Sequence, residues 1–174
     1  MFDCSDEAYL RLDAANGNGR RALVAGLGAS GRASADYLLR RGWQVSACDS
    51  RDKVPGLEGF LSAHPELAVA LGGIPQSLPQ GIDLVVMSPG ISPWFGPAAA
   101  LCAAARSAGV PVAGEIELFA GELAHLRAAS GYSPKVIGIT GTNGKTTTTS
   151  LTAKIGEAAG LKTIAAGNIG PKIG

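Results

Sequence analysis

Apolar runs of strand length alternate with longer helical patterns from residue 21 onward. The run 82–87 is almost wholly apolar, which is typical of a parallel strand buried on both faces. Glycines and prolines separate the runs and mark the turns between elements. An alternation of this kind favours an α/β fold with a Rossmann-like, doubly wound parallel sheet. The pattern predicts strands at 22–25, 44–48, 68–71, 82–87 and 110–113, and helices at 30–41, 57–63, 97–108 and 115–127.

The alternation starts again after residues 130–134, whose turn formers and proline predict a linker. Beyond the linker we expect a strand at 135–140, a glycine turn at 141–144, a helix at 145–158 and a strand at 161–165. Two strands and one helix are too few to bury a core of their own. The predicted divisions are an N-terminal leader at 1–19, a Rossmann-like domain at 20–129, a linker at 130–134 and, at 135–174, the truncated start of a second α/β domain of a longer protein.

Composition and charge narrow the class of protein. With 46% hydrophobic residues and 25 glycines, the chain has the composition of a folded α/β protein rather than a disordered tail. Fifteen Lys and Arg against fourteen Asp and Glu leave a net charge of +1, which gives no long-range attraction for nucleic acid or an anionic membrane. We therefore expect no nucleic-acid partner.

Cysteine usage and the apolar runs predict the compartment. Cys4, Cys48 and Cys102 form no C-x-x-C pair, which argues against a disulfide framework or a zinc site. No apolar run reaches the roughly 18–20 residues of a membrane span, and the N-terminus does not have the pattern of a signal peptide. We expect a cytoplasmic protein without a membrane partner.

The sequence Gly26-Leu27-Gly28-Ala29-Ser30-Gly31 is a G-x-G-x-x-G motif between a predicted strand and a predicted helix. Its glycines permit a tight turn and let backbone N–H groups and the helix N-terminus approach a diphosphate. Asp49 ends the next strand, where an acid usually accepts a hydrogen bond from a ribose or base edge. Arg51 could contact a phosphate or stack on a base. The alternatives are a loop that only packs helix on strand and an Asp49 that is only a turn residue.

A second glycine loop occupies 141–147, again between a predicted strand and a predicted helix. Its glycines permit a nest of N–H groups around phosphates, Lys145 supplies positive charge to the β- and γ-oxygens, and the Thr146 hydroxyl is placed to ligate Mg²⁺. A standard P-loop would have glycine where Ile139 stands, so this loop is a shorter variant. We predict a P-loop-type α/β ATPase domain whose ATP-binding residues are Gly141, Thr142, Asn143, Gly144, Lys145, Thr146 and Thr147.

The remaining candidates are weaker. Ser88-Pro89-Gly90-Ile91 follows a strand on the side of an open sheet where ligands bind, although a structural turn fits equally well. His64 and His125 lack neighbours at ligand spacing and are expected to be solvated or capping residues. Glu115 and Glu117 are expected to face solvent at a helix start.

Two phosphate loops in successive βαβ units are the layout of an enzyme that joins two substrates.

Taken together, these motifs resemble the N-terminal half of the Mur ligases, most of all the branch that adds D-glutamate. The Gly-Lys-Thr loop alone is shared with folylpolyglutamate ligases, whereas the joint occurrence of the motifs is specific to that branch. The resemblance covers nearly everything from residue 20 to 174. Besides the two glycine loops and Ser88–Ile91, it rests on Asp49-Ser50-Arg51, Gly114-Glu115-Ile116-Glu117-Leu118-Phe119 and Gly167-Asn168-Ile169-Gly170.

The resemblance implies an ATP- and Mg²⁺-dependent amide-bond ligase of peptidoglycan precursor synthesis, with UDP-N-acetylmuramoyl-L-alanine and D-glutamate as substrates. The substrate carboxylate would attack the γ-phosphate to give an acyl phosphate, and the D-glutamate amine would then displace phosphate. Lys145 and Thr146 would be the catalytic residues, with Mg²⁺ on Thr146. The UDP-sugar site would comprise Gly28, Ala29, Ser30, Asp49, Ser50, Arg51, Ser88, Gly90 and Asn168.

The same resemblance implies that a D-glutamate domain, further Mg²⁺ ligands and a carbamylated lysine follow Gly174, so this chain is expected to bind but not to ligate. The main alternative is a nicotinamide-binding Rossmann oxidoreductase, in which Asp49 would hold the adenosine ribose. A non-catalytic nucleotide-sensing module is the second alternative. The Gly-Lys-Thr-Thr loop argues against the oxidoreductase, because a dehydrogenase has no use for a second, Mg²⁺-type phosphate loop.

Overall fold

The computed structural model describes residues 15–167, which divide into two compact units between Tyr132 and Ser133. Of the predicted leader at 1–19, only the last residues fall in this range. They are tied to the first unit, because the Gly17 N–H donates a hydrogen bond to the Arg41 carbonyl at 2.8 Å.

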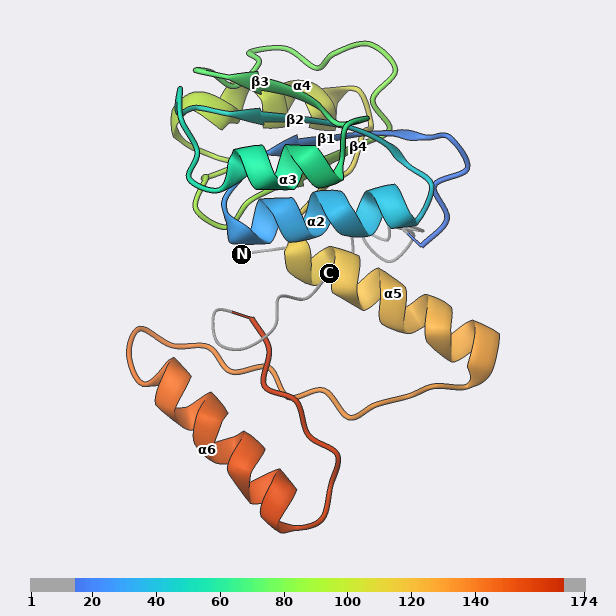
Figure 1. Cartoon of the computed structure of the whole chain (residues 1–174), viewed down its shortest axis with the longest axis vertical. Coiled ribbons are helices and arrows are strands. Elements are labelled where there is room, and N and C mark those ends of the chain that lie inside the picture. Colours follow the sequence, from blue (N-terminus) through green and yellow to red (C-terminus); the bar gives the residue numbers. More distant parts are fainter. Residues whose placement is uncertain (1–14, 168–174) are drawn as a thin grey trace. The chain divides into compact units, whose positions relative to one another are not determined.

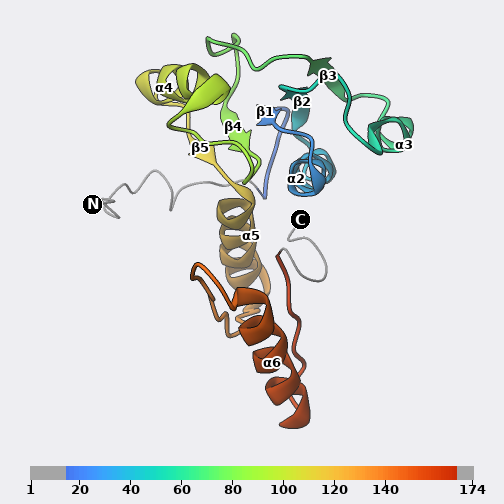
Figure 2. The same ribbon diagram turned by 90° about the vertical axis from the view of Figure 1, so that its left-hand side faces the viewer.

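The first unit contains a five-stranded, wholly parallel sheet in the order β3-β2-β1-β4-β5 (Figures 1 and 2). The order reverses between β1 and β4, and ligands of open parallel sheets bind at the carboxyl ends of strands at such a switch point. The predicted α/β fold with a Rossmann-like parallel sheet is confirmed for this unit, with the fourth and fifth strands beginning two residues later than expected. The strands are β1 (Arg21–Ala25), β2 (Gln44–Asp49), β3 (Ala68–Leu71), β4 (Leu84–Met87) and β5 (Val112–Ala113).

Helices cover both faces of this sheet (Figure 2). Side chains alternate along β1, so Ala22 and Val24 join the core on one face while Leu23 and Ala25 join the core on the other. The first core contains residues of α2, α3 and the start of α5, and the second contains residues of α4. The helices are α2 (Ala29–Arg40), α3 (Leu57–Ala63), α4 (Ala99–Ser107) and α5 (Glu115–Ser130), and a 3₁₀ turn, η1 (Gly96–Ala98), precedes α4.

Close backbone packing explains the last glycine of the first motif. A Cβ on Gly31 would lie 1.8 Å from the Gly26 carbonyl oxygen, so no larger residue fits where the first turn of α2 crosses the end of β1.

At the start of α5, Glu115 is buried, whereas Ile116 is 60% exposed. The prediction that Glu115 faces solvent was therefore wrong.

The second unit contains one regular element in its described part, residues 133–167, namely helix α6 (Lys145–Ala158) (Figure 1). The helix has the predicted bounds, and none of its residues is buried. The strands predicted at 135–140 and 161–165 are wrong for this structure, because neither segment forms a strand. A strand needs backbone partners from another strand, and over residues 133–167 neither apolar segment has one.

Candidate functional site

Three loops meet at the carboxyl edge of the sheet around the switch point. They follow β1 (26–28), β2 (50–51) and β4 (88–91), and β1 lies between the other two strands. Backbone hydrogen bonds join them: the Gly26 N–H donates to the Cys48 carbonyl at 2.7 Å, and the Ser88 N–H donates to the Ala25 carbonyl at 2.9 Å. The first glycine motif, the Asp49–Arg51 segment and the Ser88–Ile91 turn thus form one continuous edge.

The Ser88–Ile91 turn packs directly against the glycine loop. A Cβ on Gly26 would lie 2.7 Å from both the Ser88 Cβ and the Ile91 Cδ1, and the Gly26 φ of +94° also requires glycine. A Cβ on Gly28 would lie 3.8 Å from the Ser88 Oγ, which is ordinary contact. The turn therefore has a packing role, and it places the Ser88 hydroxyl beside Gly28. Gly90, by contrast, is exposed and has open space around it.

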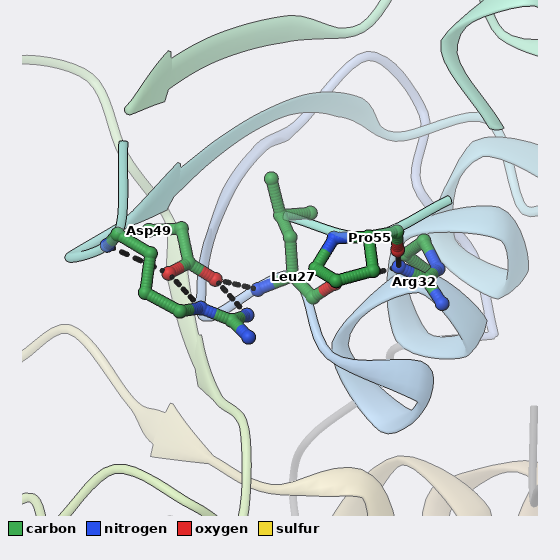
Figure 3. Close-up of polar contacts among 5 residues, drawn as sticks. Leu27, Arg32, Asp49 and Pro55 are labelled. Carbon is green, nitrogen blue, oxygen red and sulfur yellow. Dashed lines mark hydrogen bonds and ion pairs between the residues drawn. The ribbon is translucent and has the colours of Figure 1, made fainter. Parts of the chain in front are cut away.

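Asp49 lies at the centre of this edge with only 2% of its side chain exposed. Its Oδ2 accepts a hydrogen bond from the Leu27 N–H at 2.7 Å and another from the Arg51 guanidinium at 2.7 Å. Its Oδ1 accepts from the Arg51 backbone N–H at 3.0 Å and from the Arg51 Nε at 2.8 Å (Figure 3). Both carboxylate oxygens are thus engaged within the protein.

This pairing explains how a carboxylate is tolerated at a buried position. The hydrogen bonds from the Arg51 side chain, with further ones from the Leu27 and Arg51 backbone, hold the pKa of Asp49 well below its ordinary value against the opposing effect of burial. The Arg51 side chain remains 51% exposed. The structure thus gives Asp49 a role in fixing the glycine loop, which the sequence did not reveal, and leaves part of the Arg51 guanidinium accessible. Contacts of Asp49, Ser50 and Arg51 with a ligand remain predictions.

Arg32, which the sequence analysis did not single out, holds the other side of the same loop. Its Nη1 donates to the Leu27 carbonyl and to the Pro55 carbonyl, each at 3.0 Å (Figure 3). One signal was available in the sequence: a cation in the first turns of a helix is disfavoured by the helix dipole, so it needs other partners.

The second glycine motif forms the loop that leads into α6. Gly144 adopts a φ of +76° immediately before the helix, which glycine permits without strain. The Lys145 Nζ folds back and donates to the Gly141 carbonyl and, at 3.1 Å, to the Thr142 carbonyl. Thr146 and Thr147 follow in the exposed first turn. A glycine loop, a helix N-terminus and a lysine at the loop fit a phosphate group, although phosphate binding here remains a prediction.

The remaining sequence candidates are Asn168, His64, His125 and Glu117. Asn168 lies outside the described residues. His64 is partly buried at the C-terminal cap of α3, forms a tilted ring contact with Phe60 and lies 3.4 Å from an Asp36 oxygen. Glu117, expected in solvent, is partly buried and caps α5 by accepting from the Gly114 N–H at 2.8 Å.

Within residues 15–167 no cluster of three or more metal-ligating His, Cys, Asp or Glu occurs, and no helix is long and apolar enough to cross a membrane.

Comparisons with known proteins identify a family and several relatives for this chain. The family model described as "Mur ligase MurD-like, N-terminal domain" matches residues 20–114. The UDP-N-acetylmuramoylalanine--D-glutamate ligase of Cupriavidus pinatubonensis is 52% identical over 150 residues, which are 86% of this chain and 30% of that enzyme. The ligase of the same name from Burkholderia mallei is 49% identical over 150 residues, with the same shares covered. The chain thus spans about 30% of the length of these curated relatives.

Proposed function

The chain belongs to the Mur ligase family with a MurD-like N-terminal domain, and from this premise we propose that it forms part of an enzyme that joins D-glutamate to UDP-N-acetylmuramoyl-L-alanine in peptidoglycan synthesis. The observation that carries the proposal is the match of the family to residues 20–114, which hold the whole loop edge of the first unit. The relatives at 49–52% identity are named for their substrates, which supply the substrate classes of the proposal.

In this proposal the first unit binds the UDP part of the sugar nucleotide. The diphosphate would lie at the N-terminus of α2, where the backbone N–H groups of Gly28, Ala29 and Ser30 and the helix dipole favour an anion. The half-exposed Arg51 and the short Ser50 would border the uridine. Ser88 and Gly90 would line the opposite side of the loop, and Asn168 would also contact the sugar nucleotide.

The loop 141–147 would bind ATP, with Mg²⁺ on the Thr146 hydroxyl. Bound ATP would supply the phosphoryl group that activates the substrate carboxylate. A carboxylate oxygen would form a bond to the γ-phosphorus as the bond to ADP breaks, and the D-glutamate amine would then form the amide as inorganic phosphate leaves. Lys145 would neutralise charge on the transferring phosphoryl group, and the N–H groups of the loop would orient it. Because these substrates are soluble metabolites, the proposed location is the cytoplasm.

Calorimetric titration of the chain with UDP-N-acetylmuramoyl-L-alanine, UDP, NAD and ATP tests the proposal. We expect the uridine ligands to bind and NAD to give no measurable heat. A matched pair of variants checks the site: Arg51→Ala should weaken UDP binding, whereas Arg127→Ala, at the far end of α5, should not. Tighter binding of NAD than of UDP would instead favour the oxidoreductase. Binding of ATP alone would favour a nucleotide-sensing module.

A further inference from the structure

Leu27 is the middle residue of the first glycine turn, and it is fixed in three ways. Its side chain is fully buried in the core beneath α2 and α3. Its N–H donates to the Asp49 carboxylate at 2.7 Å, and its carbonyl accepts from the Arg32 guanidinium at 3.0 Å. Two ionised side chains therefore hold the two polar groups of one residue from different directions (Figure 3).

The orientation of the neighbouring N–H groups follows from peptide geometry. In a planar trans peptide the C=O and N–H groups point in opposite directions. Because the Leu27 carbonyl is held toward Arg32, the N–H of Gly28 in the same peptide must point away from Arg32. Gly28 precedes the first residue of α2, so this N–H belongs to the group of donors that a helix N-terminus offers to an anion.

We propose that Arg32 is a positioning residue for the nucleotide diphosphate: by holding the Leu27 carbonyl it sets the glycine loop in its anion-binding conformation before the ligand arrives. This inference rests on the proposed binding of UDP at this loop. A loop that is already ordered loses less conformational entropy when the ligand binds, and that saving appears as affinity.

The second bond of Arg32 extends the same role to the neighbouring loop. The same nitrogen donates to the Pro55 carbonyl at 3.0 Å, in the segment that follows Asp49–Arg51. Asp49 joins the two loops at one point and Arg32 joins them at another, so the spacing between the diphosphate loop and the segment after β2 is fixed at both. The proposed diphosphate and uridine subsites would therefore keep a constant separation.

The test compares Arg32→Ala with Arg40→Ala in the 174-residue chain. Arg40 lies on the same helix and forms an exposed ion pair with Asp36, so its removal changes the charge equally without touching the loop. We expect Arg32→Ala to weaken UDP binding about tenfold, as for loss of a charged hydrogen bond, and Arg40→Ala to leave it unchanged. The loss should be the same at 0.05 and 0.5 M NaCl, because the hydrogen bonds act within the protein.

Amide hydrogen exchange of the ligand-free chain gives a second readout that needs no ligand. In Arg32→Ala the Leu27 amide, which is bonded to Asp49 in the free chain, should exchange at least about tenfold faster, with amides of β1 and β4 unchanged as the check on folding. Unchanged exchange at Leu27 would overturn the inference, and so would a loss of UDP affinity that disappears at high salt. If the wild-type chain binds no UDP, the proposed function fails, while the exchange rates still decide whether Arg32 orders the loop.

Discussion

The two units begin with the same local sequence pattern but reach different degrees of structure. Each has an apolar segment, a glycine loop and then a helix: 22–25 leads through 26–28 into α2, and 135–140 leads through 141–144 into α6. Both helices form, yet only the first apolar segment becomes a strand. The difference arises because helix hydrogen bonds join residues four apart, whereas strand hydrogen bonds need a partner from elsewhere in the chain.

Packing shows the same contrast. Helix α2 buries six residues, among them Leu38 with no exposed surface, whereas α6 buries none. In 133–167 the apolar side chains that a core would use remain largely exposed, including Ile137 at 69% and Ile164 at 80%. The local pattern therefore specifies helix and loop, while burial, which supplies most of the stability, depends on what the helix packs against.

The largest expected effect is in amide hydrogen exchange. Amides of β1, β2 and β4 should exchange at least about a thousandfold more slowly than those of 135–167, because the first open only when the unit unfolds and the second have no buried core. Mass spectrometry after timed labelling measures this at concentrations where size-exclusion chromatography shows a monomer. Equal protection in both units of such a monomer would mean that the second unit has a core of its own.

Much of the fold could be predicted because most of its pattern is local. The helices at 57–63 and 145–158 and the strand at 68–71 were predicted with their observed bounds. The parallel sheet followed from the alternation of elements. The strands at 135–140 and 161–165 could not be excluded from the sequence, because a missing partner strand leaves no trace in the segment itself.

The candidate site was predictable only in part. The glycine spacing and the position of Asp49 at a strand end predicted that these residues lie at the carboxyl edge of the sheet, where the structure has them; ligand binding at this edge stays a prediction. The sequence did not show that the Asp49 carboxylate accepts hydrogen bonds from Leu27 and Arg51, nor that Arg32 joins Leu27 to Pro55. These contacts link residues up to 23 positions apart, and only the folded sheet brings them together.

Truncating one leucine in each unit should give the next largest difference. Leu38→Ala removes a fully buried side chain and should lower the free energy of unfolding by about 2–5 kcal/mol. Leu151→Ala, at a side chain that is 57% exposed, should change it by less than about 0.5 kcal/mol. Urea unfolding followed by circular dichroism measures both. A loss above about 2 kcal/mol for Leu151→Ala would contradict the exposed state of α6.

The loop of the second unit can be tested where a complete enzyme surrounds it. In a chimera, this segment replaces its equivalent in the Cupriavidus pinatubonensis ligase. There Lys145→Ala should lower turnover about 100-fold or more, because a cation that stabilises a transferring phosphoryl group is lost. Lys154→Ala, an exposed lysine on the same helix, is the control. ADP release dependent on D-glutamate is the measurement, and turnover of the Lys145 variant within threefold of the unmodified chimera would place Lys145 away from the phosphates.

A change at Asp49 should affect only the first unit and should depend on pH. Asp49→Asn removes the charge that pairs with Arg51 and should destabilise the unit by about 1–3 kcal/mol near neutral pH. The pKa of Asp49 is lowered in the folded state, so its stabilising effect is complete above the ordinary value of 3.8 and is lost as pH falls toward the folded-state pKa. The difference between wild type and variant should therefore be constant from pH 5 to 8 and narrow below about pH 4.

Thermal unfolding across this pH range measures the Asp49 effect, with the exposed Asp52→Asn as the control. A difference that grows as the pH falls would have the wrong sign for a carboxylate whose pKa is depressed. It would show that the pairing with Arg51 does not stabilise the unit.

The smallest expected effect concerns α5, whose middle is held to α2 and the residue after it by a polar cluster at Glu122. The Tyr37 hydroxyl donates to Glu122 at 2.7 Å, and Arg41 pairs with the same carboxylate. Tyr37→Phe should cost about 0.5–1.5 kcal/mol of stability and speed exchange in the second half of α5, with the exposed Tyr132→Phe as the silent control. Burial, with Glu122, raises the pKa of Tyr37, so its contribution is complete below the ordinary value of 10.0 and is lost only as pH rises toward the folded-state pKa. Unchanged exchange in α5 of the Tyr37→Phe variant would show that the buried first turn, with Leu118, holds the helix without the cluster. One turn of core packing would then be enough to order α5, a contact that α6 does not have, since none of its residues is buried.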